Sequence, residues 1–429
     1  MADLRTHPTL VDGEEHQSRR TREDCFATAP TWSSKPQWMK PTSWAQRHRG
    51  GLCDPFVRSS VSVEGGVVRR MTETLLPIFD GHNDVLLAVY GWPRPPGRSF
   101  FARGETGHVD LPRAREGGFA GGFFAVWVPP DPAARRPSLQ PGTEGPEGAE
   151  EGLDVLPPAV PQSFSLRMAM SLTATLFRLE AESSGEFEVV RDITQLRRCL
   201  DTTAVAAILH FEGAEPIDPE LNSLEVFYRA GLRSLGLVWS RANAFAEGVP
   251  FRFPSSPDTG PGLTAAGKEL VQACNRMGIM VDLSHLNERG FWDVAEISTA
   301  PLVATHSNAH TLSATPRNLL DTQLDAIRDT GGVVGVNFAV QFSREDGKRE
   351  PDTPIEALVR HFVYLCDRMG PDHVAFGSDF DGATIPDQLH DAAGLPRLVE
   401  ALRAAGFDDA TLRKLGHENW LRVLGQTWK

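Results

Sequence analysis

Residues 78–85 read IFDGHNDV, and this stretch decides how the rest of the chain is interpreted. It starts apolar, as a buried parallel strand does, and it ends with His82 and Asp84. Residues two apart in a strand point to the same face, so both side chains would point into one opening. Such a pair can bind a divalent ion from two directions, and a buried hydrogen-bonded His–Asp pair is the alternative.

Seven more apolar runs follow, and most of them precede a helix signal. The eight runs cover residues 78–85, 120–128, 205–213, 232–240, 278–285, 301–308, 331–338 and 373–381. Two of the helices are expected to begin at caps formed by Thr264 and Thr353 and to end at Gly278 and Gly370. Strands that alternate with helices eight times predict an α/β fold, the (β/α)8 TIM barrel. An open doubly wound sheet is the alternative, but residues 80–84 lack the glycine-rich phosphate turn that it requires.

Polar side chains of metal-binding or acid–base type stand at the ends of these runs, where barrel enzymes carry their chemistry. They are Glu212, His285, His306 and Asp379, in addition to the pair on the first run. Each histidine alone is more typical of a satisfied core residue, but neighbouring strands lie roughly 5 Å apart, so two imidazoles at matching heights can share a metal. A buried carboxylate at Glu212 needs a cation, because leaving it unpaired costs several kcal/mol. His210 lies deeper and is given a structural role, and Asp381 is assigned to a turn.

The candidate ligands number more than one zinc ion needs. They are His82, Asp84, Glu212, His285 and His306. Such a set suits two metal ions about 3.5–4 Å apart with a bridging hydroxide, which lower the pKa of the shared water and polarise a carbonyl. Asp379 could accept the water proton and pass it to the leaving amine. The pattern therefore predicts hydrolysis of an amide or ester bond.

Composition excludes several other classes of protein. The 429 residues carry 43 Lys and Arg against 56 Asp and Glu, a net charge of −13, which argues against nucleic-acid binding. The five cysteines form no CxxC pair, no apolar run reaches the length of a membrane span, and the N-terminus has no apolar signal core. We expect a cytoplasmic protein without a membrane segment.

Two segments differ from this pattern. Residues 1–70 carry 11 basic and 8 acidic residues without a helix or strand period, which indicates a disordered or non-native extension rather than a basic tail that binds a partner. Residues 129–162 are rich in Pro, Gly and Glu and predict a mobile loop on the barrel rim. The barrel itself is expected over residues 77–425.

Six motifs in this order resemble the membrane (renal-type) dipeptidase family, a branch of the metal-dependent amidohydrolase-like barrels. The motifs are DGHND at 80–84, HFEG at 210–213, VDLSH at 281–285, THSN at 305–308, PRN at 316–318 and GSDFDG at 377–382. The resemblance implies a dipeptidase with two Zn²⁺ per chain, of which His82 and Asp84 hold one and His285 and His306 the other. It also implies that Glu212 bridges the two ions and that Asp379 is the acid–base residue.

The resemblance further implies that Arg317 binds the C-terminal carboxylate of the substrate, which suits the forked guanidinium. One position departs from the family: animal members carry an intermediate-stabilising histidine where this chain has Trp239. An indole N–H can donate one hydrogen bond but carries no charge, so Trp239 is expected to contact substrate in a different way. A homodimer is left open.

Two other functions fit the same residues. The first is a related metal-dependent amidohydrolase that acts on a lactam, an N-acyl amino acid or a modified biosynthetic peptide. The second is a non-catalytic binding protein that keeps the barrel, although it would be expected to have lost a ligand.

Overall fold

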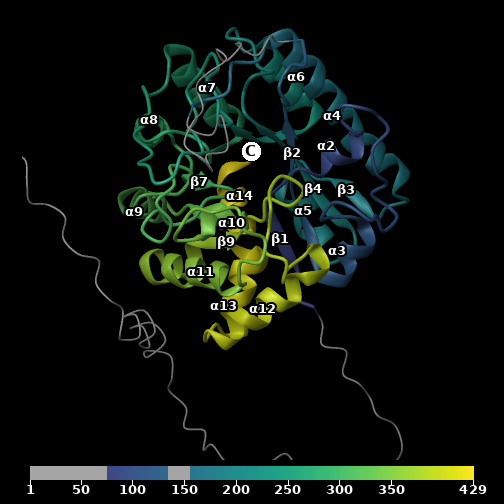
Figure 1. Ribbon diagram of the computed structural model, residues 1–429. Coiled ribbons are helices and arrows are strands. Elements are labelled where there is room, and N and C mark those ends of the chain that lie inside the picture. Colours follow the sequence, from purple (N-terminus) through teal and green to yellow (C-terminus); the bar gives the residue numbers. More distant parts are fainter. Residues whose placement is uncertain (1–74, 134–154) are drawn as a thin grey trace, which may run out of the picture. The chain divides into compact units, whose positions relative to one another are not determined.

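The computed structural model describes residues 75–133 and 155–429, and eight parallel strands in these ranges form a nearly closed barrel (Figure 1). In order around the barrel they are β1 (Ile78–Asn83), β2 (Phe119–Trp127), β4 (Val205–Glu212), β5 (Leu232–Gly236), β6 (Met280–Asp282), β7 (Val303–Ala304), β8 (Val333–Val336) and β9 (Val374–Phe376). The chain just beyond β9 returns to β1, where Asp84 N–H donates to Phe380 O at 2.8 Å. The predicted (β/α)8 barrel is confirmed, and the open sheet is excluded.

The strands differ from the predicted runs in length. Each of the eight runs overlaps a strand, but β6, β7 and β9 are only three, two and three residues long and end well before the predicted ends. A ninth strand, β3 (Phe187–Val189), was not predicted. It pairs with residues 205–207 at the start of β4, whereas β5 pairs with β4 from Leu209 onward. Three residues between two helices give too short a pattern to recognise from sequence.

Helices surround the barrel (Figure 1). They are α2 (Val85–Tyr90), α3 (Leu111–Gly117), α4 (Gln162–Glu182), α5 (Ile193–Leu200), α6 (Asn222–Ala230), α7 (Ala265–Met277), α8 (Glu288–Ile297), α9 (Asp321–Asp329), α10 (Val340–Ser343), α11 (Glu356–Met369), α12 (Leu395–Ala404), α13 (Asp409–Arg413) and α14 (Asn419–Thr427). Thr264 caps α7 by accepting from Gly267 N–H, and Gly278 and Gly370 end α7 and α11 as predicted. The predicted cap at Thr353 is wrong.

Thr353 does not cap α11, because its hydroxyl donates to Glu350 O instead. Helix α11 therefore begins at Glu356 without a side-chain cap from its own start. The N–H of Ile355 is satisfied instead by Gln388 Oε1 at 3.0 Å, from a distant part of the chain.

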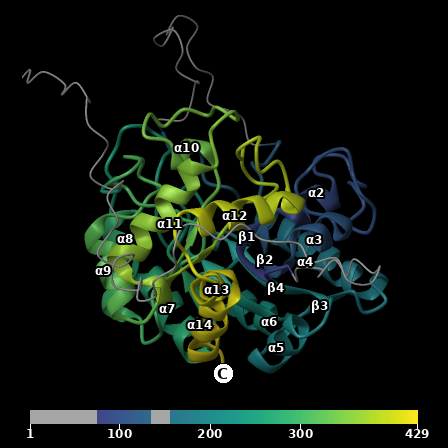
Figure 2. The ribbon, with the colours of Figure 1, turned by 90° about the horizontal axis from the view of Figure 1, so that it is seen from below.

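One end of the barrel is closed by apolar side chains. Phe79, Phe123, Met280 and Val333 from the early parts of four strands join a cluster that includes Trp420 of α14, all at most 1% exposed. Figure 2 shows α14 and α10 at opposite ends of the molecule. The carboxyl ends of the strands are therefore left to carry the polar residues.

The predicted extension over residues 1–70 lies outside the described residues, as do residues 134–154 of the predicted rim loop. The described remainder of that loop leads from β2 to α4. Among the helices of the described ranges, none combines the length and apolar character needed to span a bilayer.

Candidate metal centre

Glu212, the last residue of β4, lies among three imidazoles at the mouth of the barrel. Its Oε1 is 2.9 Å from His285 Nε2 and 3.5 Å from His306 Nε2. Its Oε2 is 3.5 Å from His82 Nε2. The two oxygens of one carboxylate thus face two different sets of side chains.

The two sets are compact and buried. On one side, Asp84 Oδ2 lies 3.5 Å from His82 Nε2. On the other, His285 Nε2 and His306 Nε2 are 3.2 Å apart. Within each set, with Glu212 counted in both, the ligand atoms lie within 4.8 Å of one another. The structure therefore brings together all five side chains that the sequence singled out as ligands.

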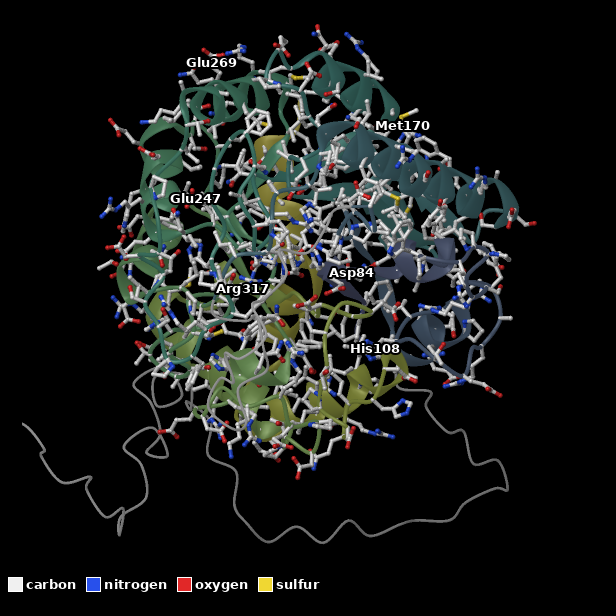
Figure 3. All side chains as sticks on the ribbon, turned by 45° about the horizontal axis from the view of Figure 1, so that its top comes forward. Asp84, His108, Met170, Glu247, Glu269 and Arg317 are labelled. Carbon is white, nitrogen blue, oxygen red and sulfur yellow. The ribbon has the colours of Figure 1, made fainter. Side chains whose placement is uncertain are left out.

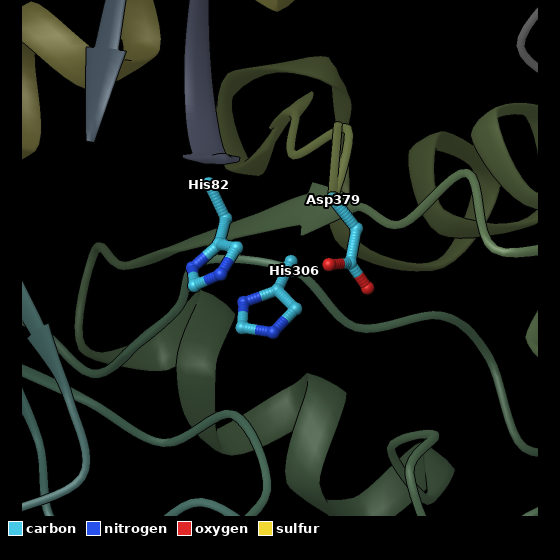
Figure 4. A group of neighbouring side chains, drawn as sticks. All are labelled: His82, His306 and Asp379. Atoms are coloured by element: carbon cyan, nitrogen blue, oxygen red, sulfur yellow. The ribbon is translucent and has the colours of Figure 1, made fainter. Parts of the chain in front are cut away.

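Asp379 joins this group from the loop after β9. Together with His82 and His306 it forms a third set of potential ligand atoms within 4.8 Å, and Figure 4 shows the three side chains around one space. Its Oδ2 accepts a hydrogen bond from Asn337 Nδ2 at 2.9 Å, and its N–H donates to His82 O at 3.0 Å. The carboxylate is thereby fixed beside the candidate ligands.

Burial and neighbouring charges shift the pKa values of these groups in different directions. Burial lowers the pKa of His82, but the negative charges of Glu212 and Asp84 outweigh it and hold this pKa well above the ordinary value. Burial raises the pKa of Glu212 to about 7. Burial, and then the positive charges around them, hold the pKa values of His285 and His306 well below the ordinary value. Both imidazoles are therefore neutral, as metal-ligating imidazoles are.

The donor set fits divalent cations. Both ring nitrogens of His82 and Oδ1 of Asp84 are buried without a hydrogen-bond partner among the described residues. Buried polar atoms are seldom left in this state, and imidazole nitrogens with carboxylate oxygens suit zinc and similar ions. Two neutral imidazoles whose Nε2 atoms face each other across 3.2 Å fit a shared cation in the same way.

The backbone at two of these residues is in the left-handed region. His285 has φ 68° and Asp379 has φ 62°, a conformation that costs a non-glycine residue of order 1–3 kcal/mol and that clusters at functional sites. The sequence predicted His285 at the end of a strand. In the structure it lies three residues beyond the end of β6. Its position is set by a loop and not by a strand.

Arg317 is buried beside the centre, and in the view of Figure 3 both Arg317 and Asp84 lie near the middle of the molecule. Its Nη2 donates to His306 O at 3.0 Å and its Nη1 to Ser307 Oγ at 3.4 Å. Its Nε has no hydrogen-bond partner among the described residues. Burial lowers the pKa of the guanidinium.

A cavity of about 230 Å³ opens onto the centre and contains parts of Asp84, Glu212, His285 and Asp379 in its wall. Its wall includes Trp239, the position at which this chain differs from the animal members of the family that it resembles. Several other wall residues were not predicted from the sequence, namely Trp127, Phe251, Gln341, Phe342 and Arg349. Trp127 is the last residue of β2. The rule that barrel enzymes carry functional residues at the carboxyl ends of strands could therefore have identified it.

The buried Arg241 supports the two indoles of this wall. Its guanidinium carbon lies 4.7 Å from the ring centre of Trp239 and 5.8 Å from that of Trp127. It also donates to Val128 O at 2.6 Å and lies 3.3 Å from Glu215. The wall is therefore held in one arrangement by a cation behind it.

Other singled-out residues lie beside the centre without belonging to it. His210 Nδ1 is 2.9 Å from Ser234 Oγ, and burial lowers its pKa to about 3. Asp381 has φ 66°, accepts from His108 N–H at 2.6 Å and pairs with Arg98.

Comparison with known proteins places these observations in a family. Residues 68–429 match the model of the membrane dipeptidase family, peptidase family M19. A metallopeptidase from Rhodobacter sphaeroides, solved with a phosphinate mimic of the dipeptide L-Ala-D-Ala, is 48% identical with a TM-score of 0.76, over 83% of this chain and 100% of that one.

Two curated proteins are also similar to this chain in sequence. The uncharacterized protein in the pqqA 5′ region of Klebsiella pneumoniae is 53% identical over 60% of this chain and 94% of its own length. The dipeptidase tcpJ of Claviceps purpurea is 27% identical over 80% of this chain and 76% of its own length.

Proposed function

Because this chain belongs to the membrane dipeptidase family, we propose that it hydrolyses the peptide bond of dipeptides at a centre of two zinc ions. The observation that carries the proposal is the division of the ligands by Glu212, whose two oxygens face two separate sets of donors. His82 and Asp84 would hold one ion, His285 and His306 the other, and Glu212 would be shared. When bound, two such cations lower the pKa of a water between them and polarise the scissile carbonyl.

Asp379 is the proposed acid–base residue. Asn337 holds its Oδ2, and its backbone is tied to His82, so the carboxylate stays at the edge of the cavity beside both ligand sets. From there it would take the proton of the attacking water and return it to the leaving amine. A positioned carboxylate in this role contributes typically about 10²- to 10⁴-fold to the rate.

The cavity supports a small substrate. At about 230 Å³ it lies below the ~300–1,000 Å³ typical of pockets for drug-sized ligands. In its wall the ring of Trp239 contacts those of Trp127 and Phe251, and these three rings would limit the size of the substrate side chains. Arg317 would bind the C-terminal carboxylate. Its Nη2 donates to His306 O, and its Nε has no hydrogen-bond partner among the described residues. The dipeptide mimic bound by the Rhodobacter sphaeroides relative agrees with a substrate of two small residues.

The test is a substrate panel with the full chain after zinc loading. We expect hydrolysis of L-Ala-D-Ala or L-Ala-L-Ala, with two metal ions per chain, and a large loss of rate when the C-terminus is amidated. Asp379→Asn should lower the rate by about 10²- to 10⁴-fold while both ions stay bound. Preference for a lactam or an N-acylated amino acid over every free dipeptide would favour the related amidohydrolase instead. Metal content well below two ions with no hydrolysis would contradict the proposal.

A further inference from the structure

The β6–β7 ladder ends early, and a carboxylate continues it. The two strands share one register pair, Asp282 with Val303. Beyond it, Asp282 Oδ1 accepts the backbone N–H of Ser284 at 3.0 Å and that of Thr305 at 2.8 Å. Asp282 is 1% exposed, so its oxygens have to be satisfied within the protein. The side chain of Asp282 thus accepts the hydrogen bonds that a longer strand would accept with its backbone at this part of the barrel mouth.

The second oxygen of Asp282 begins a chain of hydrogen bonds that ends on a candidate ligand. The hydroxyl of Thr305 donates to Asp282 Oδ2 at 2.6 Å, and Thr305 Oγ1 lies 2.8 Å from His306 Nδ1. The Nε2 of the same ring faces Glu212 and His285. His210 Nε2 is 3.7 Å from Asp282 Oδ2, too far to take that acceptor from Thr305.

The direction of these bonds determines the tautomer of His306. A threonine hydroxyl has a single proton, and this one is given to Asp282. Towards His306, Thr305 Oγ1 can therefore only accept, so Nδ1 must carry the hydrogen of the neutral ring. Nε2 is then left with its lone pair, which is the form that binds a metal ion.

We propose that Asp282 and Thr305 are positioning residues, which act through a hydrogen-bond relay to hold His306 in its metal-binding tautomer. The proposal rests on the metal centre of the proposed function and adds two residues that touch neither the ions nor the substrate. It predicts that the relay controls metal affinity on the side of His285 and His306 and not the folding of the barrel.

Three variants separate the relay from simple packing. Thr305→Val keeps the shape and removes the hydroxyl, and Thr305→Ser restores the hydroxyl. Asp282→Asn keeps an acceptor for the two backbone N–H groups but offers Thr305 a donor, which turns the hydroxyl towards Nδ1 and favours the wrong tautomer. Thr427→Val is the matched control, because Thr427 is a buried threonine of α14 whose hydroxyl donates to Val423 O at the opposite end of the barrel.

The measurement is zinc affinity of the full chain by competition with a chelator, together with crystallographic zinc occupancy at each side and thermal unfolding of the metal-free protein. We expect Thr305→Val to weaken zinc binding at the His285–His306 side by about 10- to 100-fold and Asp282→Asn to weaken it at least as much. Thr305→Ser and Thr427→Val should bind zinc as the unsubstituted chain does. Metal-free Thr305→Val should still unfold in one cooperative transition, at a lower temperature because Asp282 Oδ2 and His306 Nδ1 each lose a hydrogen-bond partner.

A second readout stays informative even if a variant fails to fold. In the metal-free, ¹⁵N-histidine-labelled chain, the ring of His306, assigned with the help of His306→Gln, should show its hydrogen on Nδ1. A hydrogen on Nε2, or zinc affinity unchanged in Thr305→Val, would overturn the relay. An unsubstituted chain that binds no zinc and cleaves no dipeptide would instead overturn the proposed function.

Discussion

The two sides of the candidate metal centre are positioned by different means. His82 lies within β1, a strand of six residues of which four pair with β2, although His82 itself lies at a register shift, and Asp84 directly follows this strand. Glu212, which both sides share, ends β4, and β4 pairs with β2 from Ala206 to Glu212. His285 and His306 lie beyond β6 and β7, strands of three and two residues. We call these the strand-held side and the loop-held side.

The difference lies in what replaces the missing backbone ladder. On the loop-held side, side-chain hydrogen bonds of Asp282, Thr305 and Ser240 position the two histidines. Every residue of a strand contributes to its backbone hydrogen bonds, and these are lost only when the barrel opens. A single substitution, in contrast, can remove one side-chain hydrogen bond. Substitutions on the strand-held side should therefore act on stability, and those on the loop-held side on metal binding.

The largest effect is expected where the two sides meet. Glu212→Gln keeps the shape of the side chain but removes the charge that both sides share. We expect zinc content to fall on both sides and dipeptide hydrolysis to fall by roughly 10³-fold or more. Metal analysis and the hydrolysis rate measure this, with the exposed Glu225→Gln on α6 as control. Full zinc affinity on either side would show that Glu212 is not shared.

The next effect tests the strand-held side at the closure between β1 and β9, where a side-chain hydrogen bond supplements the backbone pairing. Ser378 Oγ donates to Asp80 Oδ2 at 2.8 Å and accepts from Phe380 N–H at 3.1 Å, with both side chains buried. Ser378→Ala leaves these groups unpaired and should lower the free energy of unfolding by about 1–3 kcal/mol. Urea unfolding of the zinc-loaded chain measures it, with the half-buried Ser171→Ala on α4 as control. Unchanged stability with weakened zinc binding would reverse the distinction between the two sides.

The same distinction explains what could be predicted from the sequence. His82 and Glu212 end apolar runs that are strands, so the rule that polar residues at strand ends share one face applied directly. The rule also named His285 and His306, but it placed them on strands that stop two or three residues earlier. Their type and order were sufficient to find them, although the geometry behind the prediction was wrong.

The supports of the loop-held side left no local pattern to recognise. Asp282 and Thr305 are 23 residues apart, and the left-handed backbone at His285 lies on a non-glycine residue, where the sequence gives no local signal for it. The predicted cap of α11 was wrong for a similar reason, since the N–H of Ile355 is satisfied by Gln388 Oε1, which lies 33 residues away in the chain. Long-range side-chain bonds of this kind depend on the finished fold and cannot be predicted from neighbouring residues.

A pH-dependent effect tests the loop that follows His306. His361 of α11 accepts from Ala309 N–H at 3.3 Å and lies 3.2 Å from Ser343 O, so it ties this loop to α11. Burial lowers its pKa to about 3, below the ~6.5 of an unfolded histidine, so the unfolded chain binds one more proton between these values. This contribution to stability is complete above about pH 6.5 and falls by about 1.4 kcal/mol per pH unit as the pH drops towards 3.

His361→Gln removes the titration while keeping an acceptor and a donor. Unfolding free energies of the metal-free chain at pH 4.5 and 7.5 should differ less in this variant than in the unsubstituted chain. The other histidines titrate in both proteins, so the comparison isolates one proton. An equal pH dependence in the two proteins would mean that His361 does not hold the loop as a neutral ring.

The smallest effect distinguishes between the two histidines of the loop-held side. Ser240 Oγ lies 2.8 Å from His285 Nδ1, and this is its one hydrogen bond in the described part of the chain. Unlike the hydroxyl of Thr305, it has no carboxylate to which its proton is committed, so it can either donate to Nδ1 or accept from it. Ser240→Ala should therefore weaken zinc binding by less than the about tenfold lower limit expected for Thr305→Val. Chelator competition on both variants makes the comparison, and an equal loss would mean that proximity of a hydroxyl matters and its direction does not.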